Sequence, residues 1–477
     1  MVQKHELECK ANKCRGLLDK YKVLIDSPLV SFLVDDQWSF IEELGWSKYL
    51  LSLSDHDISL LPDPKCFPVT SNTPESLAML VSDCLDIYGS FTMVESGIPE
   101  GFVKLGMSPK KQHEVFRMGN AVKDIIERNK EISQVIDFGS GKGYLPEYIA
   151  LTSPGIQVVG LDREKVNTLG GSQRNRLMEK LWLPLFKKLN DGNSNLDKNS
   201  MNHYHPVTLE LKEEHICKDF VSNVSSLSEG FISPCGGTML VGLHACGDLT
   251  SLLLQTFINC PQLKSIVAVG CCYHLITQKE RTQSYMSDGP HKKQLCDPNS
   301  IHAYPTSKYL QQYPLYFTRN ALNLASQAPE RMSTSRSLPA KNLFYRAVFH
   351  VLLQDEFGSL PARNVGHSAS AAPDFFRYCK TALKKLKLCD VSDPVIQSYY
   401  ERFNDGTVER QLYAFHQLRI LLTRVIESLI LIDRMLFLHD NEIEPSILGL
   451  FDPVVSPRCY VLVAEKLRHC TMPTFGK

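Results

Sequence analysis

A strand-like run that bends through alternating glycines into a helical segment, QVIDFGSGKGYLPEYI at 134–149, constrains the fold of this chain more than any other feature. Beyond it, short apolar runs alternate with helical patterns as far as residue 270. Such alternation is typical of a parallel sheet covered by helices on both faces, so we expect an α/β fold. The predicted strands of this series are 134–138, 156–161, 207–212, 237–243 and 264–270.

Helical patterns lie on both sides of this α/β series, which itself begins with an amphipathic helix that Ser108 caps and Pro109 starts. Three polar tracts lack periodicity and are expected to have little regular structure: 190–205, 326–340 and 357–373. The predicted parts, in chain order, are a helical amino-terminal region at 1–107, the core at 108–280, insertions and helices at 281–445, and a strand hairpin at 446–477 that completes the sheet.

Composition narrows the class of protein. The 477 residues include 52 basic and 52 acidic side chains, so no overall positive charge marks a DNA-binding protein, and we expect no DNA partner. The first residues lack the apolar core of a secretory signal, and several cysteines lie in apolar runs, which favours a reducing compartment, the cytoplasm or the nucleus. The most apolar helix, 412–438, carries five charged residues, so we expect no membrane contact.

The glycine bend is a candidate ligand loop. Gly139, Ser140, Gly141 and Gly143 place backbone N–H groups in a narrow concavity at the start of a helix, which favours an adenosine-containing ligand with a negatively charged group. Asp162 ends the next strand, where an acid accepts hydrogen bonds from both ribose hydroxyls of such a ligand.

Asp137, two positions before the first glycine, separates two possible cofactors. An acid that points into the pocket would repel a pyrophosphate but attract the ammonium group of S-adenosylmethionine. The spacing of the glycines also departs from the dinucleotide fingerprint. We therefore expect S-adenosylmethionine, with its methionine part against the glycines. Asp219 is a candidate acceptor for the adenine amino group, and a surface helix cap is its alternative reading.

Two polar clusters follow the fourth and fifth predicted strands, at the sheet edge where open α/β folds bind their ligands. The first begins at His244, and the second, Cys271-Cys-Tyr-His, ends at His274. His244 or His274 is a candidate general base for methyl transfer, and Tyr273 is a candidate for positioning the acceptor. The alternative is that these side chains only complete strand ends and fill the core.

The same clusters offer four possible zinc ligands: His244, Cys246, Cys271 and His274. Structural zinc sites usually combine two closely spaced ligand pairs such as C-x2-C, and that spacing is absent here. We therefore expect no metal.

These motifs carry a resemblance to known families. VIDFGSGKGYLPEYIA and GLDREKV resemble motifs of class I methyltransferases, whereas GLHACGDL, VAVGCCYHL and LFDPVVSPRCYVLVAEK resemble the methyltransferase-like protein 25 family. The resemblance covers about 108–280 and the final hairpin, and implies a seven-stranded Rossmann-like sheet with helical insertions before that hairpin. A tRNA 2'-O-methyltransferase family has a similar H-x-C-G and C-C-H-H arrangement, which suggests RNA by analogy.

One activity suggested by an older family name, adenine N6 dimethylation, is disfavoured by the residues. Enzymes of that kind place an Asn/Asp-Pro-Pro-Tyr or Asn-Leu-Pro-Tyr tetrad after the fourth strand, to bind the amino proton and stack the base. This chain has Leu-His-Ala-Cys at 243–246 instead.

Two functional hypotheses follow. The first is an S-adenosylmethionine-dependent methyltransferase that acts on RNA or on a translation-associated protein, and the second is a non-catalytic S-adenosylmethionine-binding scaffold or sensor. The glycine loop supports donor binding in both cases. Basic residues that are candidates for holding substrate phosphates are Lys104, Lys110, Lys111, Arg174, Arg176, Lys180, Arg281, His291, Lys292 and Lys293.

Overall fold

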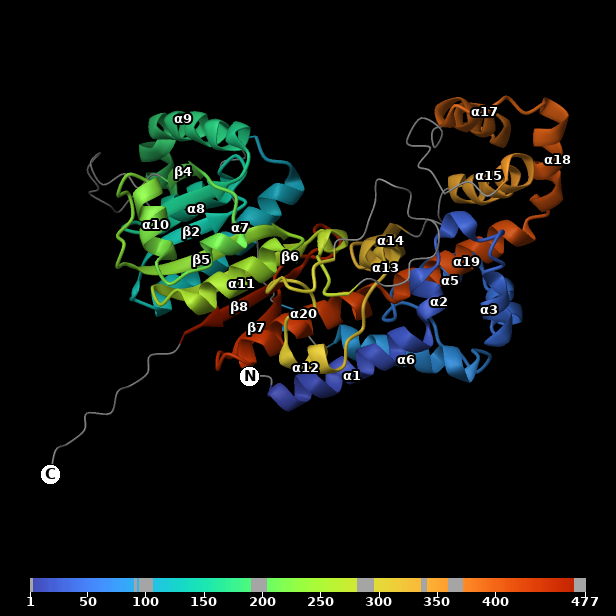
Figure 1. The fold of residues 1–477 in the computed structure, drawn as a ribbon, viewed down its shortest axis with the longest axis horizontal. Coiled ribbons are helices and arrows are strands. Elements are labelled where there is room, and N and C mark those ends of the chain that lie inside the picture. The colour runs from blue at the N-terminus through green and yellow to red at the C-terminus, as the bar shows by residue number, and fades with distance from the viewer. Residues whose placement is uncertain are drawn as a thin grey trace.

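The structure is a computed structural model that describes residues 3–89, 92–93, 106–189, 204–280, 296–335, 341–358 and 372–466. Within these ranges, only the backbone is described at 92–93 and 178–189. Figure 1 shows a sheet flanked by helices at one end of the molecule and an all-helical part at the other.

An eight-stranded sheet in the order β1-β7-β8-β6-β5-β2-β3-β4 forms the core. The strands from β2 to β6 pair in parallel, and β8 pairs antiparallel with β6 and β7. The strands are β1 Thr92–Met93, β2 Ile132–Phe138, β3 Gln157–Asp162, β4 Tyr204–Thr208, β5 Gly237–Cys246, β6 Leu263–Cys271, β7 Pro445–Gly449 and β8 Tyr460–Glu465. The seven longer strands confirm the predicted Rossmann-like sheet, and β1 adds a two-residue strand at its edge.

The strand after the second helix of the series begins and ends earlier than predicted. We placed it at 207–212, whereas β4 starts at Tyr204 and ends at Thr208. Tyr204 is 2% exposed and belongs to the core, so the apolar surface of this strand includes residues that we had assigned to a polar insertion. The rest of that insertion, 190–203, lies outside the described residues.

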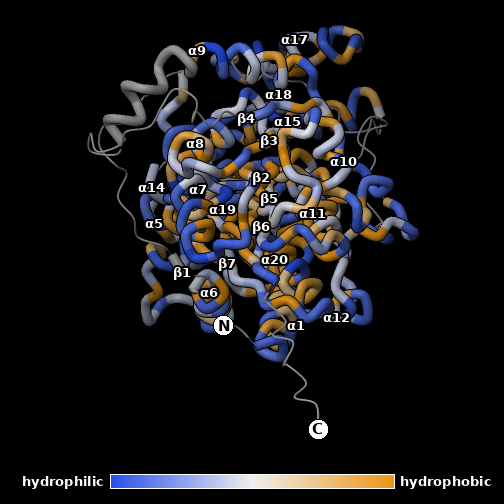
Figure 2. The backbone as a smooth tube through the Cα atoms, turned by 90° about the vertical axis from the view of Figure 1, so that its left-hand side faces the viewer, coloured by the Kyte–Doolittle hydropathy of each residue, from blue (hydrophilic) through white to orange (hydrophobic). Residues whose placement is uncertain are grey.

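Helices cover both faces of the sheet, with α7 and α8 on one side of the strands and α10 and α11 on the other (Figure 2). The helices of this part are α7 Pro109–Arg128, α8 Tyr144–Thr152, α9 Lys165–Leu189, α10 Phe220–Leu227 and α11 Leu249–Asn259. The predicted start of α7 is confirmed, because Pro109 is its first residue and the Ser108 hydroxyl oxygen accepts a hydrogen bond from the Lys111 N–H at 3.3 Å.

The amino-terminal region is helical, as predicted. It contains α1 Lys4–Lys20, α2 Lys22–Asp26, α3 Trp38–Glu43, α4 Ser47–Ser52, α5 Asp55–Leu60 and α6 Glu75–Tyr88, with a short 3-10 turn, η1, at Leu29–Ser31. Helices α3 and α4 are separate, because Gly45 between them has a φ of 73° and interrupts the helical hydrogen bonds.

The region before the last hairpin is also helical. Its helices are α12 Lys308–Gln312, α13 Arg319–Leu324, α14 Pro329–Ser335, α15 Asn342–Phe357, α17 Phe375–Leu386, α18 Asp393–Phe403, α19 Thr407–Leu421 and α20 Thr423–His439. The prediction of little structure at 326–340 was wrong for α14, whose residues Pro329 and Ser333 are buried. Of the tract at 357–373, residues 359–371 lie outside the described part.

Helix α20 joins the helical regions to the sheet. Sixteen of its 17 residues are buried, the state of a helix with neighbours on every side. It contacts α1, α6, α11 and β7. The most apolar part of the chain is thus a core helix, and among the described residues no helix is long and apolar enough to cross a bilayer.

Buried charges fix α20 against its neighbours. Arg424 donates to both carboxylate oxygens of Glu330 on α14, at 2.8 and 2.7 Å, and pairs with Glu427 on its own helix. Glu427 also accepts a hydrogen bond from Arg458, before β8, at 2.9 Å. Since both glutamates and both arginines are paired, their desolvation is offset by charge-assisted hydrogen bonds that tie α14, α20 and the final hairpin together.

Candidate functional site

The glycine loop after β2 is held by backbone and carboxylate contacts with β3. The N–H groups of Gly139 and Ser140 both donate to the carbonyl of Leu161, at 2.9 and 3.1 Å. The Gly141 N–H donates to Oδ2 of Asp162 at 2.9 Å. These contacts fix the loop across the carboxyl ends of two adjacent strands, which is where an open α/β sheet binds its ligands.

The loop glycines differ in the space that surrounds them. Gly141 has a φ of 55°, and a Cβ added to it would meet nothing within 4 Å, so open space lies above this residue. At Gly143, where φ is 79°, a Cβ would lie 1.8 Å from the hydroxyl of Tyr204. Our prediction that each glycine admits the donor therefore needs correction at Gly143, because a core tyrosine fills that space.

Asp137 is the next-to-last residue of β2, lies beside the loop and is a buried acid. It is 2% exposed, and its Oδ1 atom is buried with no hydrogen-bond partner. Burial raises the pKa of Asp137 well above its usual value, and the nearby Asp162 raises it further although Lys111 opposes this. A buried unpaired carboxylate is costly, and a ligand cation would offset that cost. The residues therefore fit the ammonium group of S-adenosylmethionine.

Asp162 lies next to the loop as expected, but its carboxylate already has protein partners. Besides Gly141, it accepts from the N–H of Glu164 at 2.9 Å and from the side-chain amide of Asn167 at 3.1 Å, both at Oδ1. Oδ2 has only one of these bonds, so it retains capacity for a further donor. Asp162 thus shapes the loop, and binding of ribose hydroxyls stays a prediction.

Asp219 lies at the start of α10, after β4. It occupies the N-cap position of α10 and is exposed, as the alternative reading of a surface helix cap expected, although its side chain makes no capping hydrogen bond. Its predicted role with the adenine amino group stays a prediction.

His244, near the end of β5, contacts a glutamate that our sequence analysis did not identify. Its Nε2 lies 3.2 Å from Oε2 of Glu114 on α7. Ser456 donates to the other oxygen of Glu114 at 2.7 Å. Burial opposes ionisation of Glu114, but the hydrogen bond and charge of His244, with the Ser456 hydrogen bond, lower its pKa to about 2. Glu114 is therefore a carboxylate at neutral pH.

This pairing selects one tautomer of the imidazole. A carboxylate only accepts hydrogen bonds, so His244 donates from Nε2, and the neutral ring carries its lone pair on Nδ1. The His244 side chain is 32% exposed, whereas that of Glu114 is 2% exposed. The arrangement is that of a partly accessible base oriented by a buried acid. It lies beside the glycine loop, since a Cβ on Gly139 would lie 3.8 Å from the His244 carbonyl.

The sequence did contain a signal for Glu114. This residue precedes Met118 by four positions and Val122 by eight, so it lies on the stripe of α7 that these buried residues define. An acid on the apolar face of a helix indicates a buried partner. The partners themselves, at 244 and 456, are too distant in sequence to identify in this way.

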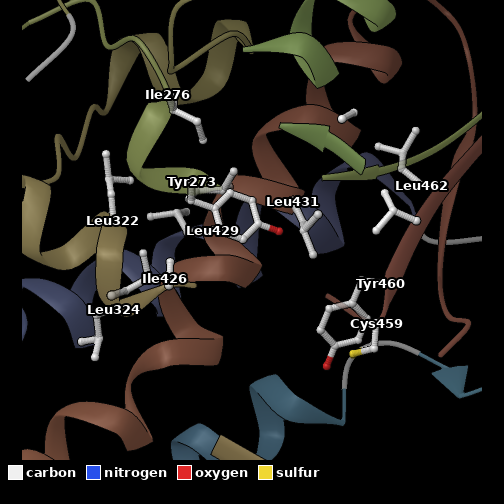
Figure 3. Packing of buried hydrophobic residues seen from close by; sticks show 14 of the residues in the cluster. Tyr273, Ile276, Leu322, Leu324, Ile426, Leu429, Leu431, Cys459, Tyr460 and Leu462 are labelled. Atoms are coloured by element: carbon white, nitrogen blue, oxygen red, sulfur yellow. The ribbon is translucent and has the colours of Figure 1, made fainter. Parts of the chain in front are cut away.

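Tyr273 does not lie at the mouth of the site, and our prediction that it positions an acceptor was wrong. It is 1% exposed, and its hydroxyl donates to Oε1 of Glu427 at 2.9 Å. Figure 3 shows its ring among apolar side chains that include Leu429 and Ile276. The chain turns inward after β6 instead of continuing toward the pocket, so Tyr273 joins the core around α20.

The other residues after β5 and β6 form a group of thiols. The sulfur atoms of Cys246 and Cys271 are 2.9 Å apart, and that of Cys272 lies close to both. Hydrogen bonds with these two thiols lower the pKa of Cys272, and the charge of His274 adds to the effect. His274 is half-buried in a 3-10 turn, η4 Tyr273–Leu275. Its role as a base stays a prediction.

Two of the basic residues proposed to hold phosphates have acidic partners within the protein. Arg174 pairs with Glu147 and lies over the ring of Tyr144 at 4.4 Å, and Lys110 lies 3.6 Å from Glu114. Their charges are therefore partly matched within the protein. Lys104, Arg281, His291, Lys292, Lys293 and the side chain of Lys180 lie outside the described residues.

Comparison with known proteins agrees with this geometry. Residues 110–279 match the family model described as a methyltransferase domain. The strand order, the glycine loop and this match define a class I methyltransferase domain whose cofactor is S-adenosylmethionine, so the predictions of fold class, activity and cofactor are confirmed.

Two curated relatives of this chain are named probable methyltransferase-like protein 25. The one from Homo sapiens is 29% identical over 464 residues, which cover 76% of this chain and 75% of the relative. The one from Mus musculus is 28% identical over 473 residues, covering 77% and 76%. A solved structure of coclaurine N-methyltransferase, bound to N-methylheliamine and SAH, covers 90% of this chain and 99% of its own at 9% identity, with a TM-score of 0.24.

Proposed function

We propose that this methyltransferase acts on an RNA hydroxyl group, with His244 as the general base. The observation that carries the proposal is the contact between His244 and the buried Glu114 carboxylate. When Nδ1 of His244 takes a proton from the acceptor, the ring becomes positively charged, and the adjacent carboxylate stabilises that charge. Glu114 and Ser456 act by holding the ring in place.

The choice of a hydroxyl acceptor follows from the need for a base. A ribose hydroxyl is a weak nucleophile until its proton is removed, whereas the amino-group enzymes use a carbonyl and an aromatic ring from their tetrad. That tetrad is absent at 243–246. The similarity of the motifs at 244–247 and 271–274 to a tRNA 2'-O-methyltransferase family supports RNA by analogy. A translation-associated protein is the competing acceptor, consistent with the equal numbers of acidic and basic residues.

We also propose that the chain corresponds to the 25B member among the relatives of methyltransferase-like protein 25. An identity of 29% with the human relative leaves room for a distinct member of the family that the motifs at 242–249 and 267–275 resemble. A cytoplasmic or nuclear location is proposed because all cysteines in the described part of the chain are unpaired thiols. DNA and membranes are not among the proposed partners.

The experiment uses donor with a labelled methyl group, incubated with RNA and protein fractions from cells that lack the enzyme. We expect the label to appear in RNA, and we expect the RNA chain to resist cleavage next to the modified ribose. With His244→Ala, this labelling should disappear. Label only in protein would contradict the RNA proposal. Donor binding by calorimetry without label in either fraction would favour the scaffold or sensor.

A further inference from the structure

Three cysteines from two adjacent strand ends meet beside the methyltransferase site. Cys246 and Cys271 are directly opposite each other in the pairing of β5 with β6. Their sulfur atoms and that of Cys272 all lie within 4.8 Å of one another. Within the described residues, this is the one group of three or more potential metal ligands.

The backbone adopts an uncommon conformation to bring in the third thiol. Consecutive side chains of a strand point to opposite faces, so Cys271 and Cys272 would diverge if β6 continued. Instead Cys272 has a φ of 51° and a ψ of 48°, in the left-handed region. A residue other than glycine reaches this region at a cost of about 1 kcal/mol or more. Such strain next to a cluster of reactive groups favours a functional reason.

Hydrogen bonds among thiols are weak, because S–H groups are weak donors and sulfur is a weak acceptor. A thiophilic cation bound between the three sulfur atoms would form strong metal–thiolate bonds with them. Zinc takes four ligands, commonly with three cysteines among them, and the thiols lose their protons when it binds.

The ligand set differs from the one considered in the sequence. There, two histidines and two cysteines lacked paired spacing, whereas the structure brings Cys272 to the other two thiols. Cys246 is exposed, Cys271 is buried and Cys272 is partly buried, so the group opens to solvent on one side. The fourth position would lie on that side.

We propose that Cys246, Cys271 and Cys272 bind a Zn²⁺ ion as three thiolates, with the fourth position open to solvent. The ion would clamp the ends of β5 and β6 together, two residues beyond His244. This inference concerns metal binding and is independent of the acceptor that the enzyme uses.

The test measures zinc in full-length protein without a polyhistidine tag, purified with a phosphine reductant and dialysed against metal-free buffer. We expect about one zinc per chain, and at least a tenfold lower content for Cys246→Ser and Cys272→Ser. Cys235→Ser is the matched control, because Cys235 is also exposed but lies outside the cluster; it should retain the metal.

A second measurement needs no variant. Cobalt added to metal-free wild-type protein should produce intense thiolate charge-transfer absorption together with the visible bands of a tetrahedral ion, and zinc should abolish both. Wild-type protein without zinc and without these bands would overturn the proposal. So would zinc content that is equal in all variants, or a Cys246–Cys271 disulfide found by peptide mass spectrometry in the reduced preparation.

Discussion

The glycine loop at the end of β2 takes its shape from the backbone and from one neighbouring strand, whereas the ends of β5 and β6 depend on side chains from distant segments. At the loop, Asp162 and Leu161 accept hydrogen bonds from the N–H groups of residues about twenty positions earlier. At the ends of β5 and β6, His244 contacts Glu114 of α7, which lies 130 residues earlier. Ser456 of the final hairpin donates a hydrogen bond to the same glutamate. The candidate donor site is thus formed locally in the chain, whereas the candidate acceptor site depends on the assembled fold.

The largest effect should come from His244→Ala. Loss of a general base lowers the rate of methyl transfer by about 10²–10⁴-fold. Donor affinity should stay within about twofold, because the proposed donor contacts lie at Asp137 and the glycine loop. Single-turnover kinetics and calorimetry measure the two quantities separately. His274→Ala is the companion variant, and a rate loss equal to that of His244→Ala would contradict the assignment of the base.

Next in size is the pH dependence contributed by Glu114. Its pKa falls from 4.5 to about 2 on folding, so the carboxylate adds stability above pH 4.5 that disappears as the pH falls through about 2. The shift corresponds to roughly 3 kcal/mol. In urea unfolding at several pH values, the stability difference between wild type and Glu114→Gln should shrink across this window. Glu43→Gln, at an exposed position, should show a constant difference.

Asp137→Asn should change stability and binding in opposite directions. Burial raises the pKa of Asp137, so the wild type loses stability as the pH rises through that value, and the neutral amide removes this loss. We expect ligand-free protein more stable by about 1–3 kcal/mol at pH 8, and donor binding about 10–100-fold weaker. Thermal unfolding and calorimetry test both. If the variant binds the donor as tightly as the wild type, the proposal that the Asp137 carboxylate binds the ammonium group of the donor is wrong.

The smallest effects compare two buried tyrosines. Tyr273→Phe removes a hydrogen bond to buried Glu427 and should cost about 1–2 kcal/mol. Tyr204→Phe removes a hydroxyl that has no partner, so it should change stability by less than about 0.5 kcal/mol or increase it. Urea unfolding of the ligand-free variants gives both values. Equal losses would contradict the view that Tyr273 is structural.

The sequence allowed prediction of the sheet, the glycine loop and Asp137 because strand and turn signals act within a few residues. It failed at Tyr273, since position after a strand does not reveal which way the chain turns. The same limit applies at Cys272, whose left-handed backbone ends the alternation of side chains. Glu114 had a signal on the apolar stripe of α7, but its partners could not be identified because they lie more than a hundred positions away.

A crystal structure with S-adenosylhomocysteine would test the central claim most directly. We predict that the ammonium group lies within about 3 Å of Asp137 Oδ1, above the open space at Gly141, with the sulfur facing His244. An Asp137 that still has no partner in the complex, or a ligand bound away from the glycine loop, would contradict it.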